Sequence, residues 1–270
     1  MNPIGIMQGR LSQRQGASAQ AFPWLSWREE FAQARECGFT RLEWLVAADR
    51  LDENPLWTDE GVREVQRQVA TTGVAVTSVC ADCFIRRPFI RVPERERQAN
   101  QAALERLVVR CAQIGIEVVL IPLLEGGAIR DRREGLAVLE GLQRALAIAE
   151  ASGIQLGLEC DLPGLVLREL IDQSGLPALG AYYDVGNAVA AGHDVVADVR
   201  ALGGVLCGIH LKDRKRDGPS LMLGEGDVNF TEFFNTLAAV GYGGPLILET
   251  PAGTDAMASA RRNRAFIKAE

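Results

Sequence analysis

The amino-acid sequence predicts a single (β/α)8 barrel over residues 1–270, and three observations carry that prediction. Eight short apolar segments alternate with longer amphipathic segments along the chain. Most of the eight are nearly continuous in apolar character, as parallel strands covered on both faces should be. Several amphipathic segments end at a glycine just before the next apolar segment. Eight βα units in about 250 residues are typical of a TIM barrel.

The eight apolar segments are predicted to be the barrel strands, in chain order. They are PIGIMQ (3–8), TRLEWLV (40–46), VAVTSVC (74–80), EVVLIPL (117–123), IQLGLE (154–159), LGAYYDV (179–185), VLCGIHL (205–211) and PLILET (245–250). Their length and β-branched content separate them from the segments between them. We therefore expect a parallel sheet that closes on itself.

The segments between the predicted strands have helix signals at their ends. Ser26 and Glu29 have the spacing of a capping box that begins the first helix. Asn229 and Glu232 have the spacing of an N-cap and N3 pair. Helix ends with a left-handed residue are expected at Gly38, Gly73, Gly115, Gly153 and Gly241.

Nothing in the sequence divides the chain into two domains. No Ser- or Pro-rich linker and no shift in composition interrupts the βα repeats. The alternative architecture is an open doubly wound sheet. That architecture is disfavoured because no Gly-rich phosphate fingerprint follows the first predicted strand.

Composition and charge limit the classes of partner. The net charge of −6 provides no basic surface for nucleic acid, and no apolar run approaches the roughly 18 residues of a membrane helix. The first twenty residues lack the apolar core of a secretory signal, so we expect a cytoplasmic protein with reduced cysteines. Cys80 and Cys83 form a CxxC without a second pair, which favours a structural role.

Metal-binding residue types stand at the ends of the last four predicted strands. These strands end with Glu159, Asp184, His210 and Glu249. Active sites of TIM barrels lie at the carboxyl ends of the strands, so the four side chains are expected to converge. Three carboxylates and one imidazole suit a hard divalent cation such as Mn²⁺, Mg²⁺ or Co²⁺, and the lack of cysteine argues against structural zinc.

Several motifs resemble the sugar-phosphate isomerase/epimerase family, which has a xylose isomerase-like TIM barrel. The resemblance covers nearly the whole chain, and its strongest motifs lie between Glu159 and Glu249. The motifs are GIMQGRLS at the start, DVGN, HLKD, LGEGDVNF and GGPLILET. The resemblance implies that Glu159, Asp184, His210 and Glu249 bind one divalent metal, with Mn²⁺ first and Mg²⁺, Co²⁺ or Zn²⁺ as alternatives.

The resemblance also implies roles in the ketose 3-epimerase reaction. The two glutamates, Glu159 and Glu249, would form the acid/base pair, and Arg216, six residues after the histidine, would contact the substrate. Epimerases of free ketoses often have a histidine three residues after the strand-six aspartate. This chain has Asn187 there, as in relatives of pentulose-5-phosphate 3-epimerases, which favours a phosphorylated sugar.

The chemistry of these residue types agrees with that reaction. Removing a proton beside a ketone requires stabilisation of the resulting enediolate, which a divalent cation provides as a Lewis acid. Two carboxylates on opposite faces of the carbon explain inversion, since one removes the proton and the other returns one. The predicted function is therefore a metal-dependent epimerase acting at C3 of a sugar or sugar phosphate.

Three further residues are candidates for substrate binding. Lys212 lies two residues after His210 and so on the same face of the strand, where it is suited to hold a phosphate. Gln8 follows the first strand. Glu43 lies within the second strand, and two orientations remain open: toward the interior as a substrate contact, or toward the helices as a paired acid.

Other functions remain as alternatives. An aldose–ketose isomerase or an inosose-type dehydratase on the same scaffold would begin with the same proton abstraction. A DNA-repair enzyme related to endonuclease IV is disfavoured, because a chain with two histidines cannot build that three-zinc site. A non-catalytic sugar- or metal-binding module would not need the acid/base pair and Arg216. A homodimer is also compatible with an exposed barrel surface.

Overall fold

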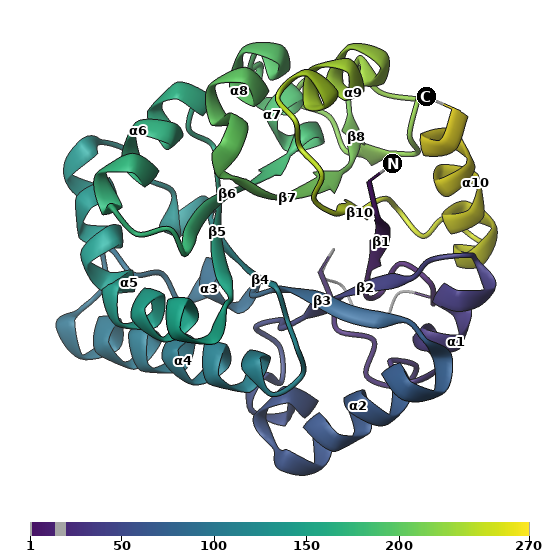
Figure 1. Cartoon of the computed structure of the whole chain (residues 1–270), viewed down its shortest axis with the longest axis horizontal. Coiled ribbons are helices and arrows are strands. Elements are labelled where there is room, and N and C mark those ends of the chain that lie inside the picture. The colour runs from purple at the N-terminus through teal and green to yellow at the C-terminus, as the bar shows by residue number, and fades with distance from the viewer. Residues whose placement is uncertain (1, 14–19, 270) are drawn as a thin grey trace.

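The chain folds into a closed barrel of eight parallel strands (Figure 1). A computed structural model describes residues 2–13 and 20–269. Around the ring the strands follow their order in the chain, and β1 closes the ring against β10. The strands are β1 (Ile4–Met7), β2 (Arg41–Leu45), β3 (Ala75–Cys80), β4 (Val118–Leu123), β5 (Gln155–Cys160), β6 (Leu179–Asp184), β7 (Leu206–Leu211) and β10 (Leu246–Leu248).

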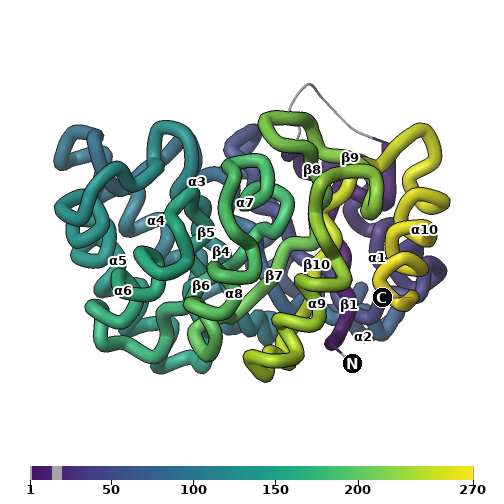
Figure 2. The backbone as a smooth tube through the Cα atoms, turned by 90° about the horizontal axis from the view of Figure 1, so that it is seen from above, coloured from purple at the N-terminus to yellow at the C-terminus, as the bar shows by residue number. Residues whose placement is uncertain are grey.

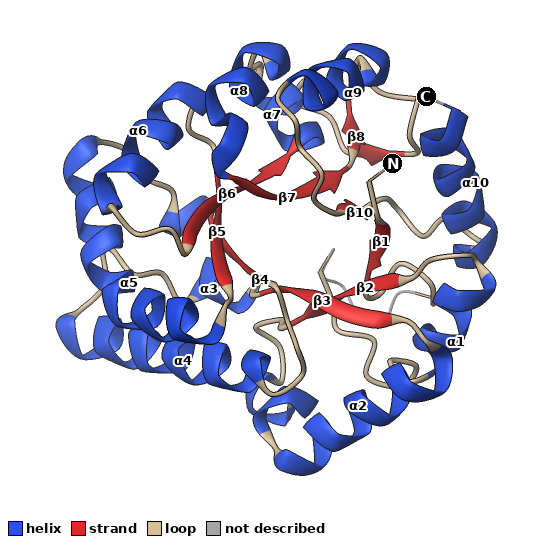
Figure 3. Ribbon diagram, in the orientation of Figure 1, coloured by secondary structure: helices blue, strands red, loops and turns tan. Residues whose placement is uncertain are grey.

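Helices form an outer ring around the strands (Figure 3). The described residues also form four single 3-10 turns, at Leu51–Glu53, Pro55–Trp57, Glu125–Gly127 and Gly203–Val205. Among the described residues no helix combines the length and the apolar character needed to cross a membrane. The α-helices are α1 (Glu29–Glu36), α2 (Asp59–Thr72), α3 (Cys83–Arg86), α4 (Glu94–Ala112), α5 (Arg132–Ser152), α6 (Gly164–Ser174), α7 (Val185–Ala191), α8 (Val195–Leu202), α9 (Phe230–Ala239) and α10 (Ala256–Ala269).

A small hairpin marks the end of the barrel at which the strands finish. Strands β8 (Asp213–Arg214) and β9 (Ser220–Leu221) pair antiparallel directly after β7. Seen from the side, this hairpin lies at the upper edge and the N-terminal end of β1 at the lower edge (Figure 2). The buried Asp213 carboxylate accepts hydrogen bonds from the backbone N–H groups of Gly224, Gly226 and Val228, at 2.8, 2.9 and 3.3 Å. Asp213 therefore fixes the loop that contains the LGEGDVNF motif.

The predicted strands are confirmed, with small shifts at their ends, and the closed ring excludes the open-sheet alternative. The five predicted glycine ends are also confirmed, since Gly38, Gly73, Gly115, Gly153 and Gly241 all have φ between +68° and +83°. At the start of α9, Asn229 Oδ1 accepts the backbone N–H of Glu232 at 3.2 Å, as predicted.

The capping box predicted at Ser26 is wrong. Helix α1 begins at Glu29 with Arg28 at the N-cap position, and the Arg28 side chain makes no capping hydrogen bond. The preceding residues form turns in which the Trp27 ring packs against Trp44, with centroids 5.3 Å apart. The Ser26 carbonyl accepts the backbone N–H of Glu30 at 3.0 Å, so Ser26 belongs to these turns.

The Tyr182 side chain lies inside the barrel and is almost fully buried. Two glycines leave room for its ring. A Cβ atom added at Gly208 would lie 2.3 Å from Cε2 of Tyr182, and one added at Gly157 would lie 3.0 Å from its Cβ. Because barrel interiors are close-packed, a methyl group at Gly208 has no space unless the tyrosine moves.

We predict that Gly208→Ala lowers the free energy of unfolding by about 1–3 kcal/mol, the usual cost of overpacking. Urea unfolding followed by circular dichroism measures the change. Gly204→Ala is the control, because nothing lies within 4 Å of a Cβ atom at that position. Equal stability of the two variants would contradict the packing described for Tyr182.

Candidate metal centre and active site

Four consecutive strands of the ring deliver three carboxylates and one imidazole to the upper end of the barrel. Glu159 lies in β5, Asp184 ends β6, His210 lies in β7, and Glu249 directly follows β10. Asp184 and His210 are register partners in the β6–β7 pair. The parallel register places the side chains at a similar height, because strands of one barrel end on the same side.

Three of these side chains form a compact group. One ligand atom from each of Glu159, Asp184 and His210 can be chosen so that all three lie within 4.8 Å of one another. Glu249 adjoins the group, since its Oε2 atom lies 2.9 Å from Nδ1 of His210. All four side chains are buried. The structure therefore brings the four residues predicted from the strand ends into one cluster.

Asp184 has two roles in this cluster. Its Oδ1 atom accepts the backbone N–H of Asn187 at 2.9 Å, which caps the N-terminus of α7. Its Oδ2 atom lies 2.8 Å from Nζ of Lys212. The helix cap holds the carboxylate in one orientation and leaves the second oxygen directed at the cluster.

Lys212 is the buried positive charge beside the acids. Its Nζ atom lies 2.8 Å from Oδ2 of Asp184 and 2.8 Å from Oε1 of Glu249. The lysine is two residues beyond His210 and points to the same side of the strand, as the alternation of side chains predicts. A buried ammonium group between two carboxylates offsets part of their mutual repulsion.

The surroundings push the pKa values of the two glutamates in opposite directions. Burial raises the pKa of Glu159, and the nearby Asp184 carboxylate adds to the rise. Burial alone would also raise the pKa of Glu249, but the Lys212 ammonium and His210 outweigh it and hold that pKa well below its usual range. Likewise, burial would lower the pKa of His210, but the Glu43 and Glu249 carboxylates raise it well above the ordinary value.

Glu43 points into the barrel and contacts protein side chains with both oxygens. Its Oε1 atom lies 2.6 Å from Nε2 of His210, and its Oε2 atom accepts the hydroxyl of Tyr182 at 2.6 Å. The side chain is 0% exposed. Of the two orientations left open by the sequence, the structure shows the inward one, with His210 and Tyr182 as the observed partners.

Gln8 lies beside Glu43 at the end of β1 and is also fully buried. Its backbone N–H donates to the Glu43 carbonyl at 3.0 Å, and its Oε1 atom accepts the backbone N–H of Leu45 at 3.0 Å. Its Nε2 group has no hydrogen-bond partner among the described residues. A buried donor without a partner is costly, which marks Gln8 as a candidate ligand contact.

Of the polar residues that follow β6 and β7, Asn187 contacts the cluster and Arg216 does not. Asn187 donates from Nδ2 to Oε1 of Glu159 at 3.2 Å and accepts Nη1 of Arg214 at 2.9 Å. Arg214 is therefore linked to the cluster through one side chain. Arg216 is exposed, and its guanidinium lies against Gly192, where an added Cβ atom would be 2.8 Å from Nη2. The structure does not bring Arg216 to the acids, and its substrate role remains a prediction.

Glu249 has two further partners that sequence reasoning did not assign. Gln20 donates from Nε2 to Glu249 Oε1 at 2.5 Å, and Nη2 of Arg10 lies 3.6 Å from the same oxygen. Arg10 also donates to Oε1 of Gln20 at 2.5 Å. Both residues lie in the loop between β1 and α1, and residues 14–19 between them are outside the described ranges. The GIMQGR motif was the one available signal, since it ends at Arg10.

The start of that loop is held by a buried carboxylate. Glu30 of α1 accepts the backbone N–H of Gly9 at 2.9 and 3.1 Å with its two oxygens and the Ser12 hydroxyl at 2.6 Å. Gly9 has φ of +78°, a conformation that glycine adopts without strain. Glu30 thus fixes the backbone on both sides of Arg10.

The cluster fits a hard divalent cation. Carboxylates and a neutral imidazole are suitable donors, and cysteine is absent from the group. The surroundings of His210 support a cation at this cluster. Its Nδ1 atom is buried and, although 2.9 Å from Glu249, lacks the geometry of a hydrogen bond, so it has no hydrogen-bond partner among the described residues. An imidazole nitrogen with this environment is available as a ligand.

Comparison with protein families identifies the family that the sequence motifs resemble. Residues 31–270 match the family described as xylose isomerase-like TIM barrel. The match covers most of the chain, and the protein belongs to this family.

Individual relatives are more distant. SgbU of Escherichia coli strain K12 is 29% identical over 247 residues, which cover 83% of this chain and 84% of SgbU. The L-ribulose-5-phosphate 3-epimerase UlaE of Escherichia coli O157:H7 is 26% identical over 259 residues, which cover 90% and 89% of the two chains.

Solved structures confirm the barrel fold. The D-psicose 3-epimerase of Clostridium cellulolyticum H10, solved with D-tagatose, superposes with a TM-score of 0.78 at 16% identity and covers 99% of this chain and 98% of its own. An L-ribulose 3-epimerase superposes with a TM-score of 0.76 at 21% identity and covers 100% of this chain and 94% of its own. At these identities the similarity establishes the fold.

We predict that Glu30→Gln removes a pH dependence from the stability of the protein. Burial raises the pKa of Glu30 from 4.5 to about 7, against the hydrogen bonds from Ser12 and Gly9 and the charge of Arg10, which lower it. Below pH 4.5 the group is protonated in both states. As the pH rises from 4.5 to 7, Glu30 loses its proton in the unfolded chain but keeps it in the folded chain. The free energy of unfolding of the wild type therefore falls by up to about 3 kcal/mol relative to the variant.

Urea unfolding at pH 4.5, 5.5, 6.5 and 7.5 measures this difference. Glu29→Gln is the control, because Glu29 is the exposed neighbour on the same helix. A constant stability difference between wild type and Glu30→Gln across this range would contradict the assignment.

Proposed function

We propose that the protein is a divalent-metal-dependent epimerase that inverts C3 of a ketose or ketose phosphate. The observation that carries the proposal is the buried cluster of Glu159, Asp184, His210 and Glu249 at the carboxyl ends of the strands. Such a cluster of like charges is costly unless a cation or substrate uses it. The relationship to UlaE, an L-ribulose-5-phosphate 3-epimerase, supports the same reaction type.

The two glutamates supply the proton chemistry in this proposal. One carboxylate takes the proton from C3 of the ketose, and the other, in its acid form, delivers a proton to the opposite face of the same carbon. The product is the C3 epimer, and the two glutamates end with their protonation states exchanged. Glu159 and Glu249 come from different strands, which suits contact with the two faces of a bound sugar.

The remaining residues of the cluster hold the substrate and the cation. Asp184 and His210 would bind the cation together with the two glutamates. When bound, the cation supplies Lewis-acid stabilisation of the negative charge that develops on the ketose oxygen. The donor set favours Mn²⁺, with Mg²⁺, Co²⁺ and Zn²⁺ as alternatives. The Lys212 ammonium lies 2.8 Å from carboxylate oxygens of both Asp184 and Glu249. From there its positive charge would help to stabilise the negative charge on the ketose oxygen.

A phosphorylated pentulose is the substrate class that we favour. Asn187 stands where epimerases of free ketoses often have a histidine, and here it connects Glu159 to Arg214. Arg214 therefore provides positive charge beside the cluster, which suits a phosphate at the far end of the sugar, whereas Lys212 is buried between Asp184 and Glu249. We keep Gln8, whose buried Nε2 group is without a partner among the described residues, as a contact to a substrate hydroxyl. Arg216 would have to move from Gly192 to reach the sugar.

An NMR screen in D₂O tests the reaction type directly. Ketopentoses, ketohexoses and their phosphates are incubated with the protein and Mn²⁺, and a chelator removes the metal before spectra are recorded. We expect deuterium at C3 together with the C3 epimer. Movement of the carbonyl group between C1 and C2 of the sugar would indicate an aldose–ketose isomerase. Loss of water from the sugar would indicate a dehydratase. Either result would contradict the proposal.

We predict that Glu159→Gln and Glu249→Gln each reduce turnover by a factor of at least about 10²–10⁴, because an amide cannot exchange the required proton. The circular dichroism spectrum should stay that of the wild type. Glu140→Gln, on the exposed side of α5, is the control and should retain full turnover. Substantial activity in either cluster variant would rule out the two-glutamate mechanism.

A further inference from the structure

Beneath the acid cluster, three side chains form a continuous hydrogen-bonded chain inside the barrel. The Tyr182 hydroxyl donates to Oε2 of Glu43 at 2.6 Å, and Oε1 of Glu43 lies 2.6 Å from Nε2 of His210. The residues come from β6, β2 and β7, so the chain crosses the barrel interior. Tyr182 and His210 also pack ring to ring, with centroids 4.7 Å apart and planes at 64°.

The direction of each hydrogen bond in this chain follows from the chemistry of the groups. A carboxylate accepts and cannot donate, so Tyr182 and His210 both donate to Glu43. The proton of the imidazole on this side is therefore on Nε2. The other ring nitrogen, Nδ1, faces Glu249 and is without a hydrogen-bond partner among the described residues. With its proton on Nε2 held by Glu43, the ring binds a cation through the Nδ1 lone pair once Nδ1 carries no proton.

The position of Glu43 is difficult to explain by stability alone. Its side chain is 0% exposed, and the one ion-pair partner found for it in the described ranges is His210, which is 1% exposed. A buried carboxylate without an arginine or lysine partner usually costs more than its attraction returns. Metal-binding histidines, in contrast, commonly donate their second N–H to a carboxylate that fixes the ring and increases its basicity.

We infer that Glu43, held in place by Tyr182, is a positioning residue that fixes His210 with its proton on Nε2 and presents Nδ1 to the cation. The inference rests on the cation site of the proposed function but not on the reaction performed there. It assigns Glu43 to the metal centre instead of to the substrate. It also explains the glycine at position 208, where a Cβ atom would displace the Tyr182 ring.

The test uses Glu43→Gln, which keeps the shape of the side chain and removes its charge. We expect the affinity for Mn²⁺, measured by calorimetry without substrate, to fall by about 10- to 100-fold. Tyr182→Phe removes the hydroxyl and keeps the ring, and we expect a smaller loss in the same direction. This second variant preserves the test if Glu43→Gln does not fold.

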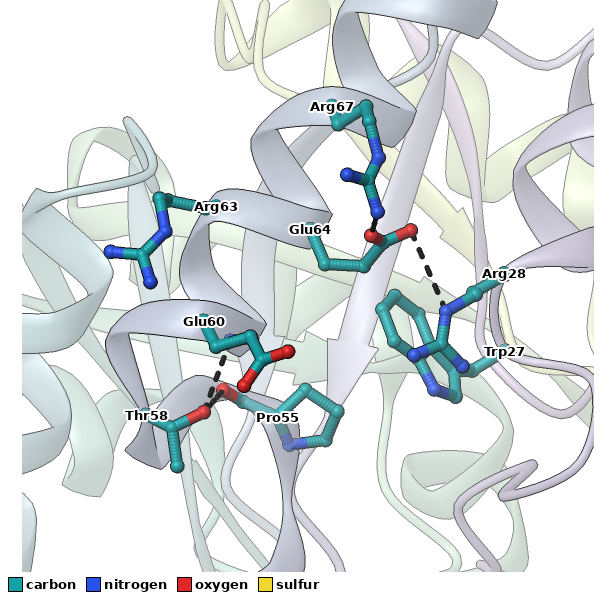
Figure 4. Close-up of a pocket in the computed structure, with 9 residues that line it drawn as sticks. Trp27, Arg28, Pro55, Thr58, Glu60, Arg63, Glu64 and Arg67 are labelled. Atoms are coloured by element: carbon teal, nitrogen blue, oxygen red, sulfur yellow. Dashed lines mark hydrogen bonds and ion pairs between the residues drawn. The ribbon is translucent and has the colours of Figure 1, made fainter.

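Glu64→Gln is a matched control, because Glu64 is a buried, ion-paired glutamate far from the cluster. Figure 4 shows it between Arg67 and Arg28, and its helix α2 lies in the outer ring of Figure 1. Its Oε1 atom lies 3.5 Å from Nε of Arg28 and accepts Nε2 of Gln68 at 2.9 Å. This variant should change stability and leave the Mn²⁺ affinity within twofold, or about 0.4 kcal/mol, of the wild type.

Imidazole ¹⁵N spectra of the Zn²⁺-loaded protein report the tautomer directly. The chain has two histidines, and His193→Gln identifies the signals of His210. We expect the wild type to show a protonated Nε2 and a coordinated Nδ1, and Glu43→Gln to lose this single tautomer. Unchanged affinity and tautomer in Glu43→Gln and Tyr182→Phe would overturn the inference. A wild-type protein that binds neither Mn²⁺ nor Zn²⁺ at His210 would overturn the proposed cation site as well.

Discussion

The concentration of negative charge inside the mouth of the barrel is the constraint on which the rest of the structure depends. Glu43, Glu159, Asp184 and Glu249 are all buried, and each would be costly there alone. Lys212 and His210 supply positive charge or hydrogen bonds within the same few ångströms. A protein retains such an arrangement when function requires it, because apolar side chains of similar size would usually be at least as stable.

The residues of this cluster lie at two levels along the barrel axis and have different roles. At the upper level, the ends of β5, β6, β7 and β10 present oxygen and nitrogen ligands toward the opening. At the lower level, Glu43 and Tyr182 contact protein groups and set the orientation of His210. The glycines at 157 and 208 make the lower level possible by leaving space for the tyrosine. The absence of side chains at these two glycines therefore helps to set the geometry of the site above them.

Much of this could be predicted from the sequence, because the relevant signals are local. Apolar runs and glycine ends predict the strands, and polar residues at strand ends predict Glu159, Asp184, His210 and Glu249 as neighbours. The partners of Glu43 could not be predicted, since alternation gives the face of a side chain but not the residue opposite it in a closed barrel.

Loop residues were the least predictable part of the site. The β8–β9 hairpin turns the chain after His210, so that Arg214 contacts Asn187 while Arg216 lies exposed against Gly192. Their spacing from the histidine does not encode this turn. Arg10 and Gln20 reach Glu249 from a loop whose first residues are held by the buried Glu30, a contact between distant residues that no local pattern reveals.

A crystal structure of the Mn²⁺-soaked protein, with anomalous data, tests the central claim most directly. The account predicts one strong anomalous peak at about 2.0–2.3 Å from Nδ1 of His210 and from carboxylate oxygens of Glu159, Asp184 and Glu249. A peak bound by other residues, or coordination of His210 through Nε2, would contradict it.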